Sequence, residues 1–303
     1  MKKVIILLVA CLWFHSTPSR GTTKTVQIIA SNGPLLYIAK RIGGTFVHVT
    51  PLSKSHSRTW EPGSTATSRM EKADLILLNG ADFEPWYRNL NIDKAKLVKT
   101  AEVFRSQWLI SDIHVIDRTH GQSTQSGYNP YVWLSPRFAK LQAIAIERAI
   151  LKIVYDRSIE RAAETLYLEL DELDAQYRRL AQFSSRYKIM AAQTTFAYIS
   201  QHYDLDFVNQ YIDPLVPLNI DHKDLLAKIL SPYKGSPIIW DKAPNEELQK
   251  FLEAKLQISS FTLDSGVQSK DLVQLLRSNL SELSKALGVH PQYTLSKRPE
   301  ETR

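Results

Sequence analysis

The chain has 303 residues, of which 44% are hydrophobic and 23% are charged. This length and balance leave room for one large domain or two ordinary ones, and they exclude a disulfide mini-protein, a disordered tail and a protein with several membrane spans. The formal net charge is +7, which a nucleic-acid-binding protein can also carry, so the position of the basic residues decides its meaning.

The N-terminus has the pattern of an export signal. A short basic start precedes an apolar run over residues 4–14, which is too short to span a bilayer and matches the hydrophobic region of a secretory signal. We expect residues 1–21 to be a signal peptide cleaved near its end. The residues up to Cys11 also resemble a lipobox, so a lipid anchor on that cysteine is the alternative route. A periplasmic location follows from either route.

Loss of the signal changes the charge argument. Residues 1–21 contain three basic residues and no acidic one, so the net charge falls from +7 to +4. The remaining basic residues are interspersed with acidic ones, and no basic block or RNA-binding aromatic motif is present. We therefore expect no nucleic-acid partner. Cleavage would also remove the single cysteine, which suits an oxidising compartment.

The first half of the mature chain alternates short apolar runs with one helical pattern. Apolar or β-branched runs of four to six residues predict strands, and spacings of three and four residues before a Gly-Gly pair predict a helix. The predicted strands cover residues 25–30, 46–50, 74–78 and 97–100, and the predicted helix covers residues 34–42. This alternation favours an α/β fold with a parallel sheet.

The middle of the chain is dominated by helical patterns. Residues 112–136 are polar with little periodicity, and no regular element is predicted there. A helix is predicted over residues 136–155, and a second begins at Ser158 as its N-cap. The apolar positions of this second helix recur for about 25 residues without Gly or Pro, which corresponds to roughly 40 Å. Such a helix is longer than a small domain is wide, so we interpret it as a rigid connection between two lobes.

The second half repeats the alternation. The predicted strands cover residues 188–192, 207–211, 237–240 and 258–263, and the predicted helices cover residues 194–202, 221–230, 245–255 and 270–287. The expected architecture is therefore two lobes of parallel sheet and helices, with a ligand cleft between them. The predicted boundaries are residues 22–157 for the N-terminal lobe, 158–186 for the lobe-spanning helix and 187–303 for the C-terminal lobe.

Several short segments resemble a known family when they are taken in order. These are a strand-to-helix segment over residues 31–44, the triplet Trp-Glu-Pro at 60–62, the Ala-Asp-Leu, Asn-Gly and Glu-Pro-Trp groups over residues 73–86, and Asn-Pro-Tyr-Val-Trp-Leu-Ser-Pro at 129–136. Together they resemble the metal-specific, zinc- and manganese-binding class of solute-binding proteins of ABC importers. The resemblance extends over essentially the whole chain after the signal.

The resemblance implies a function in transport. A protein of this class captures a divalent metal or related ligand between its lobes and delivers it to an ABC permease in the membrane, acting as a monomer. It is not an enzyme, and the chain also lacks the G-x-S-x-G, P-loop, H-E-x-x-H and C-x-x-C motifs.

The residues at the metal positions of the family are mostly changed. The family combines three histidines with one carboxylate, a set that suits Zn²⁺. In this sequence the corresponding positions in the ligand cleft are Arg58, Tyr131, Gln193 and Asp264. A guanidinium only donates hydrogen bonds, a tyrosine titrates near pH 10, and a glutamine offers a neutral carbonyl oxygen. These changes argue against a high-affinity zinc or manganese site.

Two interpretations of the altered site follow. If a metal binds, Asp264 is the retained ligand and His56, two residues before Arg58, is the candidate substitute. Alternatively, Arg58 occupies the place of the cation and pairs with Asp264, since a carboxylate alone in a desolvated cleft is costly. Tyr131 and Gln193 would then complete the hydrogen bonds. In that case the protein is a degenerate family member that binds an anion or chelate, or a protein-interaction module.

Overall fold

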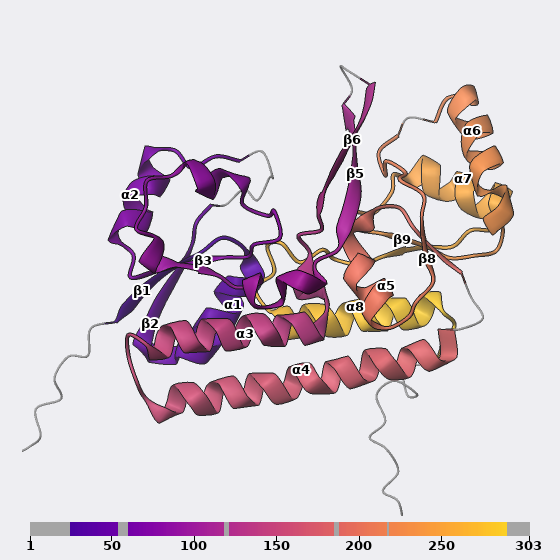
Figure 1. Ribbon diagram of the computed structural model, residues 1–303. Coiled ribbons are helices and arrows are strands. Elements are labelled where there is room, and N and C mark those ends of the chain that lie inside the picture. Colours follow the sequence, from indigo (N-terminus) through magenta and orange to yellow (C-terminus); the bar gives the residue numbers. More distant parts are fainter. Residues whose placement is uncertain (1–24, 54–59, 118–120, 185–187, 217, 290–303) are drawn as a thin grey trace, which may run out of the picture.

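The computed structural model describes residues 25–289 except 54–59, 118–120, 185–187 and 217. Two α/β lobes lie side by side on a base of long helices, and a two-stranded ribbon projects between them (Figure 1). The predicted two-lobed α/β fold with parallel sheets is confirmed. Arg58 and His56 lie outside the described residues.

The first lobe contains a four-stranded parallel sheet with the order β2-β1-β3-β4. Its strands are β1 (Val26–Ala30), β2 (Val47–Pro51), β3 (Leu75–Leu78) and β4 (Leu97–Lys99), and its helices are α1 (Gly33–Gly43) and α2 (Ser64–Lys72). All four residues of β3 are buried, which explains why this strand is an uninterrupted apolar run. The sequence patterns did not predict α2, because most of its residues are small or polar and only Met70 is buried.

The second lobe repeats the arrangement with a parallel sheet of order β10-β9-β7-β8. Its strands are β7 (Ile189–Ala191), β8 (Phe207–Asn209), β9 (Ile238–Trp240) and β10 (Ser260–Thr262), and its helices are α5 (Ala197–His202), α6 (Ile220–Leu230) and α7 (Glu246–Leu256). Short 3₁₀ helices connect elements in both lobes. They are η1 (Gly44–Phe46), η2 (Pro85–Asn89), η3 (Lys94–Lys96), η4 (Glu102–Gln107), η5 (Val132–Leu134), η6 (Thr194–Phe196) and η7 (Ser231–Tyr233).

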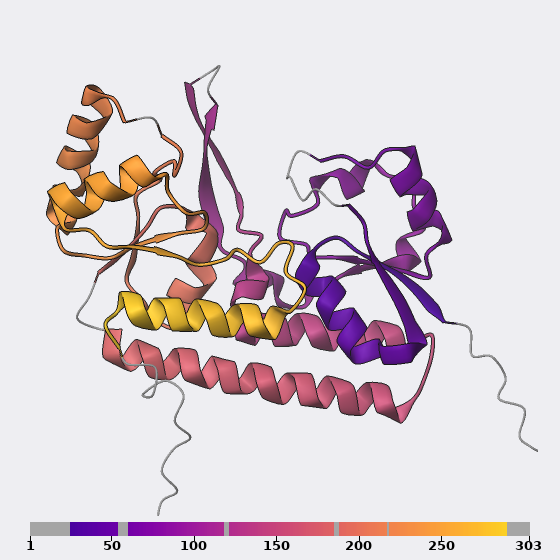
Figure 2. The same cartoon turned by 180° about the vertical axis from the view of Figure 1, so that it is seen from behind.

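Three helices form the base, namely α3 (Pro136–Leu151), α4 (Arg157–Ser184) and α8 (Leu272–Ala286). With 28 residues, α4 is about 42 Å long and runs beneath both lobes (Figures 1 and 2). Its fully buried side chains recur at intervals of three and four residues, at Ile159, Ala163, Leu166, Leu170, Leu173, Tyr177 and Leu180. This stripe confirms the predicted lobe-spanning helix.

Two helix ends differ from the sequence prediction. The N-cap of α4 is Asp156 and not Ser158, because the Asp156 carboxylate accepts hydrogen bonds from both the backbone N–H (2.8 Å) and the hydroxyl (2.6 Å) of Ser158. Helix α3 ends at Leu151 rather than at residue 155, since the chain turns there to enter α4.

The polar segment after residue 110 is an antiparallel ribbon. Strands β5 (Ile110–Asp117) and β6 (Gly121–Tyr128) pair in continuous register from Ile110 opposite Tyr128 to Asp117 opposite Gly121. The expectation of no regular element over residues 112–136 was therefore wrong. The segment is mostly polar in sequence, so the alternation that marks a strand with one apolar face is weak there.

A single apolar core joins the lobes. Buried residues of both sheets, among them Ile28 and Leu77 of the first lobe and Ile189 and Ile239 of the second, belong to one cluster with the stripe of α4 and the inner face of α8. The outer part of the second lobe has its own smaller cluster around Trp240. The lobes therefore share one interior on the side of the base.

Polar contacts reinforce this shared interior. Tyr198 of α5 is fully buried, and its hydroxyl accepts a hydrogen bond from the Leu109 N–H (3.1 Å) and donates one to the Asn129 carbonyl (3.0 Å). Beside it, the Ser135 hydroxyl and His202 Nδ1 are 2.6 Å apart. Burial, helped by the positive charge of Arg137, lowers the pKa of His202 to about 4, so the ring is neutral at neutral pH.

Among the helices of the described ranges, none combines the length and the apolar character that a bilayer crossing requires.

We predict that Tyr198→Phe lowers the free energy of unfolding by about 2 kcal/mol, because it removes the partner of the partly buried Leu109 N–H and of the buried Asn129 carbonyl. Urea denaturation followed by circular dichroism measures this loss. Tyr155→Phe is the matched control, since Tyr155 is 66% exposed. Equal stabilities of the two variants would show that the Tyr198 hydroxyl does not hold the lobes together.

Candidate functional site

The segments that follow the carboxyl ends of both sheets meet between the lobes. The Gly33 N–H, after β1, donates to the Val267 carbonyl, after β10, at 2.8 Å. The Trp133 indole N–H donates to the Ser265 carbonyl at 2.8 Å. We call this region the lobe junction. In open α/β sheets, ligands bind outside the carboxyl ends of the strands, so the lobe junction is the candidate site.

Tyr131 lies at the lobe junction on the first lobe. The side chain of Asn129 determines its backbone position, because Asn129 Oδ1 accepts a hydrogen bond from the Tyr131 N–H (3.0 Å) while Asn129 Nδ2 donates to the Thr194 carbonyl of the second lobe (2.8 Å). The ring of Tyr131 meets the buried ring of Trp133 edge to face at 5.5 Å. The motif over residues 129–136 thus connects the lobes and presents Tyr131 between them.

Gln193 enters the same region from the second lobe. It follows β7 and is the N-cap residue of η6. Its side-chain amide donates a hydrogen bond to the Ile212 carbonyl at 3.4 Å. The next residue, Thr194, accepts the hydrogen bond from Asn129, so Gln193 is directly adjacent to the contact between the lobes.

Asp264 lies on the loop after β10, and Asn279 of α8 holds its backbone. Asn279 Oδ1 accepts from the Asp264 N–H (2.9 Å), and Asn279 Nδ2 donates to the Asp264 carbonyl (2.8 Å). The carboxylate accepts a hydrogen bond from the Gly266 N–H (2.8 Å), and the residue as a whole is exposed. Hydrogen bonds thus hold the Asp264 backbone at both its N–H and its carbonyl.

Gly266 is required for that loop. Its φ of +72° is a conformation that residues with side chains rarely adopt, and a Cβ there would approach the Leu275 side chain to 2.2 Å. The same turn places the Ser265 carbonyl against Trp133, so the loop conformation also determines one contact between the lobes.

Asp241 is a second carboxylate at this sheet edge that the sequence prediction missed. It follows the buried strand β9, and its side chain accepts a hydrogen bond from the Thr195 hydroxyl at 2.9 Å. The signal was an acidic residue directly after the apolar strand β9, whereas Asp264 follows β10 only after the buried Leu263.

The described side chains at the lobe junction offer phenol, amide and carboxylate oxygen atoms, from Tyr131, Gln193, Asp241 and Asp264. Tyr131, Gln193 and Asp264 lie on segments of the lobe junction, and their role as ligand positions stays a prediction. No group of three or more His, Cys, Asp or Glu residues that could hold a metal occurs within the described ranges. The pairing of Arg58 with Asp264 stays a prediction because Arg58 lies outside those ranges.

A buried carboxylate supports the first lobe near its sheet edge. Glu84 accepts hydrogen bonds from the backbone N–H groups of Asn79 (2.7 Å) and Gly80 (3.0 Å) and from the Ser31 hydroxyl, so it joins the ends of β3 and β1. Burial raises the pKa of Glu84 from 4.5 to about 7, and the three hydrogen bonds partly oppose that rise. The Asn-Gly and Glu positions noted in the sequence are thus one structural unit.

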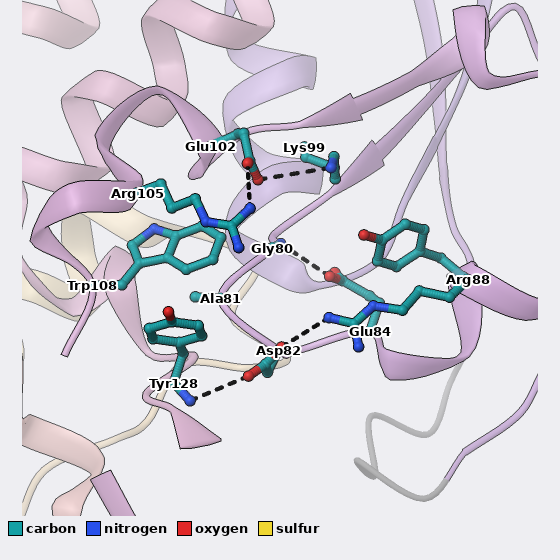
Figure 3. Close-up of a pocket in the computed structure, with 11 residues that line it drawn as sticks. Gly80, Ala81, Asp82, Glu84, Arg88, Lys99, Glu102, Arg105, Trp108 and Tyr128 are labelled. Atoms are coloured by element: carbon teal, nitrogen blue, oxygen red, sulfur yellow. Dashed lines mark hydrogen bonds and ion pairs between the residues drawn. The ribbon is translucent and has the colours of Figure 1, made fainter. Parts of the chain in front are cut away.

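A small pocket of about 50 Å³ adjoins Glu84 (Figure 3). Its charged side chains form pairs, with Arg88 3.4 Å from Asp82 and Arg105 2.9 Å from Glu102. Trp108 and Tyr128 close one side, with their rings edge to face at 5.1 Å. The small volume makes this pocket a poor site for a ligand.

Comparisons with known proteins agree with this architecture. The family model described as "Zinc-uptake complex component A periplasmic" matches residues 28–286. The iron-binding protein YfeA of Yersinia pestis is 21% identical over 291 residues, which are 90% of each chain. The zinc-bound ZnuA-like domain of Streptococcus pneumoniae AdcA has a TM-score of 0.72 at 18% identity and covers 87% of this chain and 99% of its own. The periplasmic zinc-binding protein TroA of Treponema pallidum has a TM-score of 0.67 at 19% identity, over 87% and 99% of the two chains.

We predict that Glu84 makes stability fall as the pH rises from 4.5 to 7. In this interval the folded state holds a proton that the unfolded state has lost, so the contribution is complete below pH 4.5 and disappears as the pH passes 7. The unfolding free energy of the wild type should therefore fall by about 3 kcal/mol over this range relative to that of Glu84→Gln, which carries no titrating group at this position. Urea denaturation at several pH values measures it.

The control for this experiment is Glu71→Gln, at an exposed position of α2. If the difference between the wild type and Glu84→Gln does not change with pH, the buried carboxyl does not have a raised pKa.

Proposed function

The chain belongs to the ZnuA family of periplasmic zinc-uptake components, and we propose that it is the solute-binding component of an ABC importer. It captures a divalent metal ion or a related ligand between its lobes and delivers it to a membrane permease. The observation that carries this proposal is the family match over residues 28–286, which includes both lobes, α4 and every described segment of the lobe junction.

We infer that the ligand is held at the lobe junction by Tyr131, Gln193, Asp241 and Asp264. These side chains offer carboxylate, phenol and amide oxygens, which suit a hard cation such as Mn²⁺ better than Zn²⁺. Imidazole, the ligand that most favours zinc, is absent from these four positions. The expected binding is therefore weaker than that of a site with three histidines.

The alternative function differs in the role of Asp264. If Arg58 pairs with it, the site holds its own positive charge, and the protein binds an anion or chelate or contacts another protein. No contact within the described residues favours this alternative. The first function predicts that removing the Asp264 charge weakens metal binding, whereas the alternative predicts that the wild type binds no metal at this site, so one titration separates them.

The location and partners follow from the family. We propose that residues 1–21 direct export to the periplasm, with a lipid on Cys11 as the second route, and that the protein works there as a monomer beside its permease. No catalytic step is part of this function.

We predict that wild-type protein binds Mn²⁺ with at most micromolar affinity and that Asp264→Asn weakens this by about tenfold, since it removes the one formal charge among the family positions that attracts a cation. Isothermal titration calorimetry with a competing chelator measures both constants. Arg58→His should strengthen Zn²⁺ binding, because it replaces a repelling cation by a neutral ligand.

The matched control is Asp221→Asn, at an exposed position of α6. Nanomolar zinc binding that Asp264→Asn leaves unchanged would contradict the assigned site. An absence of metal binding in the wild type that is reversed by Arg58→His would favour the alternative.

A further inference from the structure

A larger groove lies on the first lobe, away from the lobe junction. It follows the outer side of β4, which is the edge strand of its sheet, and has a volume of about 490 Å³. This volume is in the range of about 300 to 1,000 Å³ that is usual for small-molecule sites. We call it the edge groove, and it is lined by Tyr87, Arg88, Leu90, Ile92, Lys94, Leu97 and Lys99.

The charge of the edge groove is uniformly positive. Arg88, Lys94 and Lys99 line it, and no carboxylate does. The acidic partners of two of these cations lie on the other side, in the pocket of Figure 3, with Asp82 3.4 Å from Arg88 and Glu102 3.8 Å from Lys99. At such distances and at partly exposed positions, these ion pairs are weak and leave both cations able to bind another anion.

The rest of the lining is apolar. Leu90 and Leu97 are half-buried and pack, together with Ile92 and Tyr87, against the core cluster of the first lobe around Met70 and Trp86. The ring of Tyr87 has Lys99 Nζ at 5.6 Å and Arg88 Cζ at 6.0 Å from its centroid. An aromatic surface is thus bordered by two cations, and aliphatic side chains continue it.

We propose that the edge groove binds a small amphipathic organic anion, a molecule with an apolar body and one carboxylate, phosphate or sulfonate group. The acidic group is attracted by Arg88 and Lys99, whose charged ends border the Tyr87 ring, and either cation can donate a hydrogen bond to it. The apolar body covers Leu90, Ile92 and Leu97, which removes their exposed surface from water.

The lining distinguishes this ligand from its alternatives. A free metal ion is repelled by three cations. A small inorganic anion gains nothing from the aliphatic side chains, and a neutral apolar molecule leaves the cations unused. The site is independent of the proposed transport function because none of Tyr131, Gln193, Asp241 and Asp264 lines it.

Fluorescence titration with two related probes tests the proposal. Anilinonaphthalene sulfonate has an apolar ring system with one acidic group, and phenylnaphthylamine has the same rings without it. We expect the sulfonate probe to bind the full-length protein at one saturable site and the neutral probe to bind about tenfold more weakly. Octanoate should displace the sulfonate probe, whereas acetate should not, because acetate lacks the apolar body.

The double variant Arg88→Gln/Lys99→Gln identifies the site. It should weaken binding of the sulfonate probe by about tenfold and change binding of the neutral probe less than twofold. Lys255→Gln, at an exposed position of α7, is the matched control, and circular dichroism verifies that each variant is folded. The proposal is overturned if the double variant weakens sulfonate binding no more than the control does, or if octanoate and acetate displace the probe equally. The Mn²⁺ affinity of the double variant should equal that of the wild type, so a failure here does not bear on metal binding.

Discussion

The apolar stripe of α4 is the constraint on which the rest of the structure depends. Its buried residues from Ile159 to Leu180 join side chains of both sheets in one core. The helix is about 42 Å long and its stripe packs against both sheets, so the two lobes share one continuous core. Because their carboxyl edges face each other, the loops after β1, β7 and β10 are brought together without being adjacent in sequence.

The polar contacts of the lobe junction act on top of this shared core. Trp133, Asn129 and Tyr198 each use a side chain of one lobe to satisfy a backbone group of the other. A buried group that loses such a partner is costly, so these bonds oppose wide separation of the lobes. Wide separation of the lobes would have to break these three hydrogen bonds.

The residues at the lobe junction explain how a family scaffold can keep its fold and change its chemistry. The Asn129 side chain and the Trp133 indole make the structural contacts, while Tyr131 between them is the position to which the sequence resemblance assigns a metal ligand. Replacing that ligand leaves the connection of the lobes intact. The same separation applies on the second lobe, where Asn279 holds the Asp264 loop whatever the carboxylate binds. The loss of histidines is therefore compatible with an undisturbed fold.

The sequence by itself determined the alternation of strands and helices, the length of α4 and the order of the family motifs, because apolar periodicity records which face of each element is buried. It did not reveal the ribbon of β5 and β6 or helix α2, whose patterns lack a continuous apolar face. Asp241 and the edge groove emerged only from the tertiary structure. Asp241 is placed at the lobe junction because β9 lies beside β7, which brings it to Thr195. The edge groove is lined by cations alone because Asp82 and Glu102, the partners of Arg88 and Lys99, line the pocket of Figure 3 instead. The position of each carboxylate relative to its basic partner depends on how the chain folds, so it cannot be read from the spacing of these residues in the sequence.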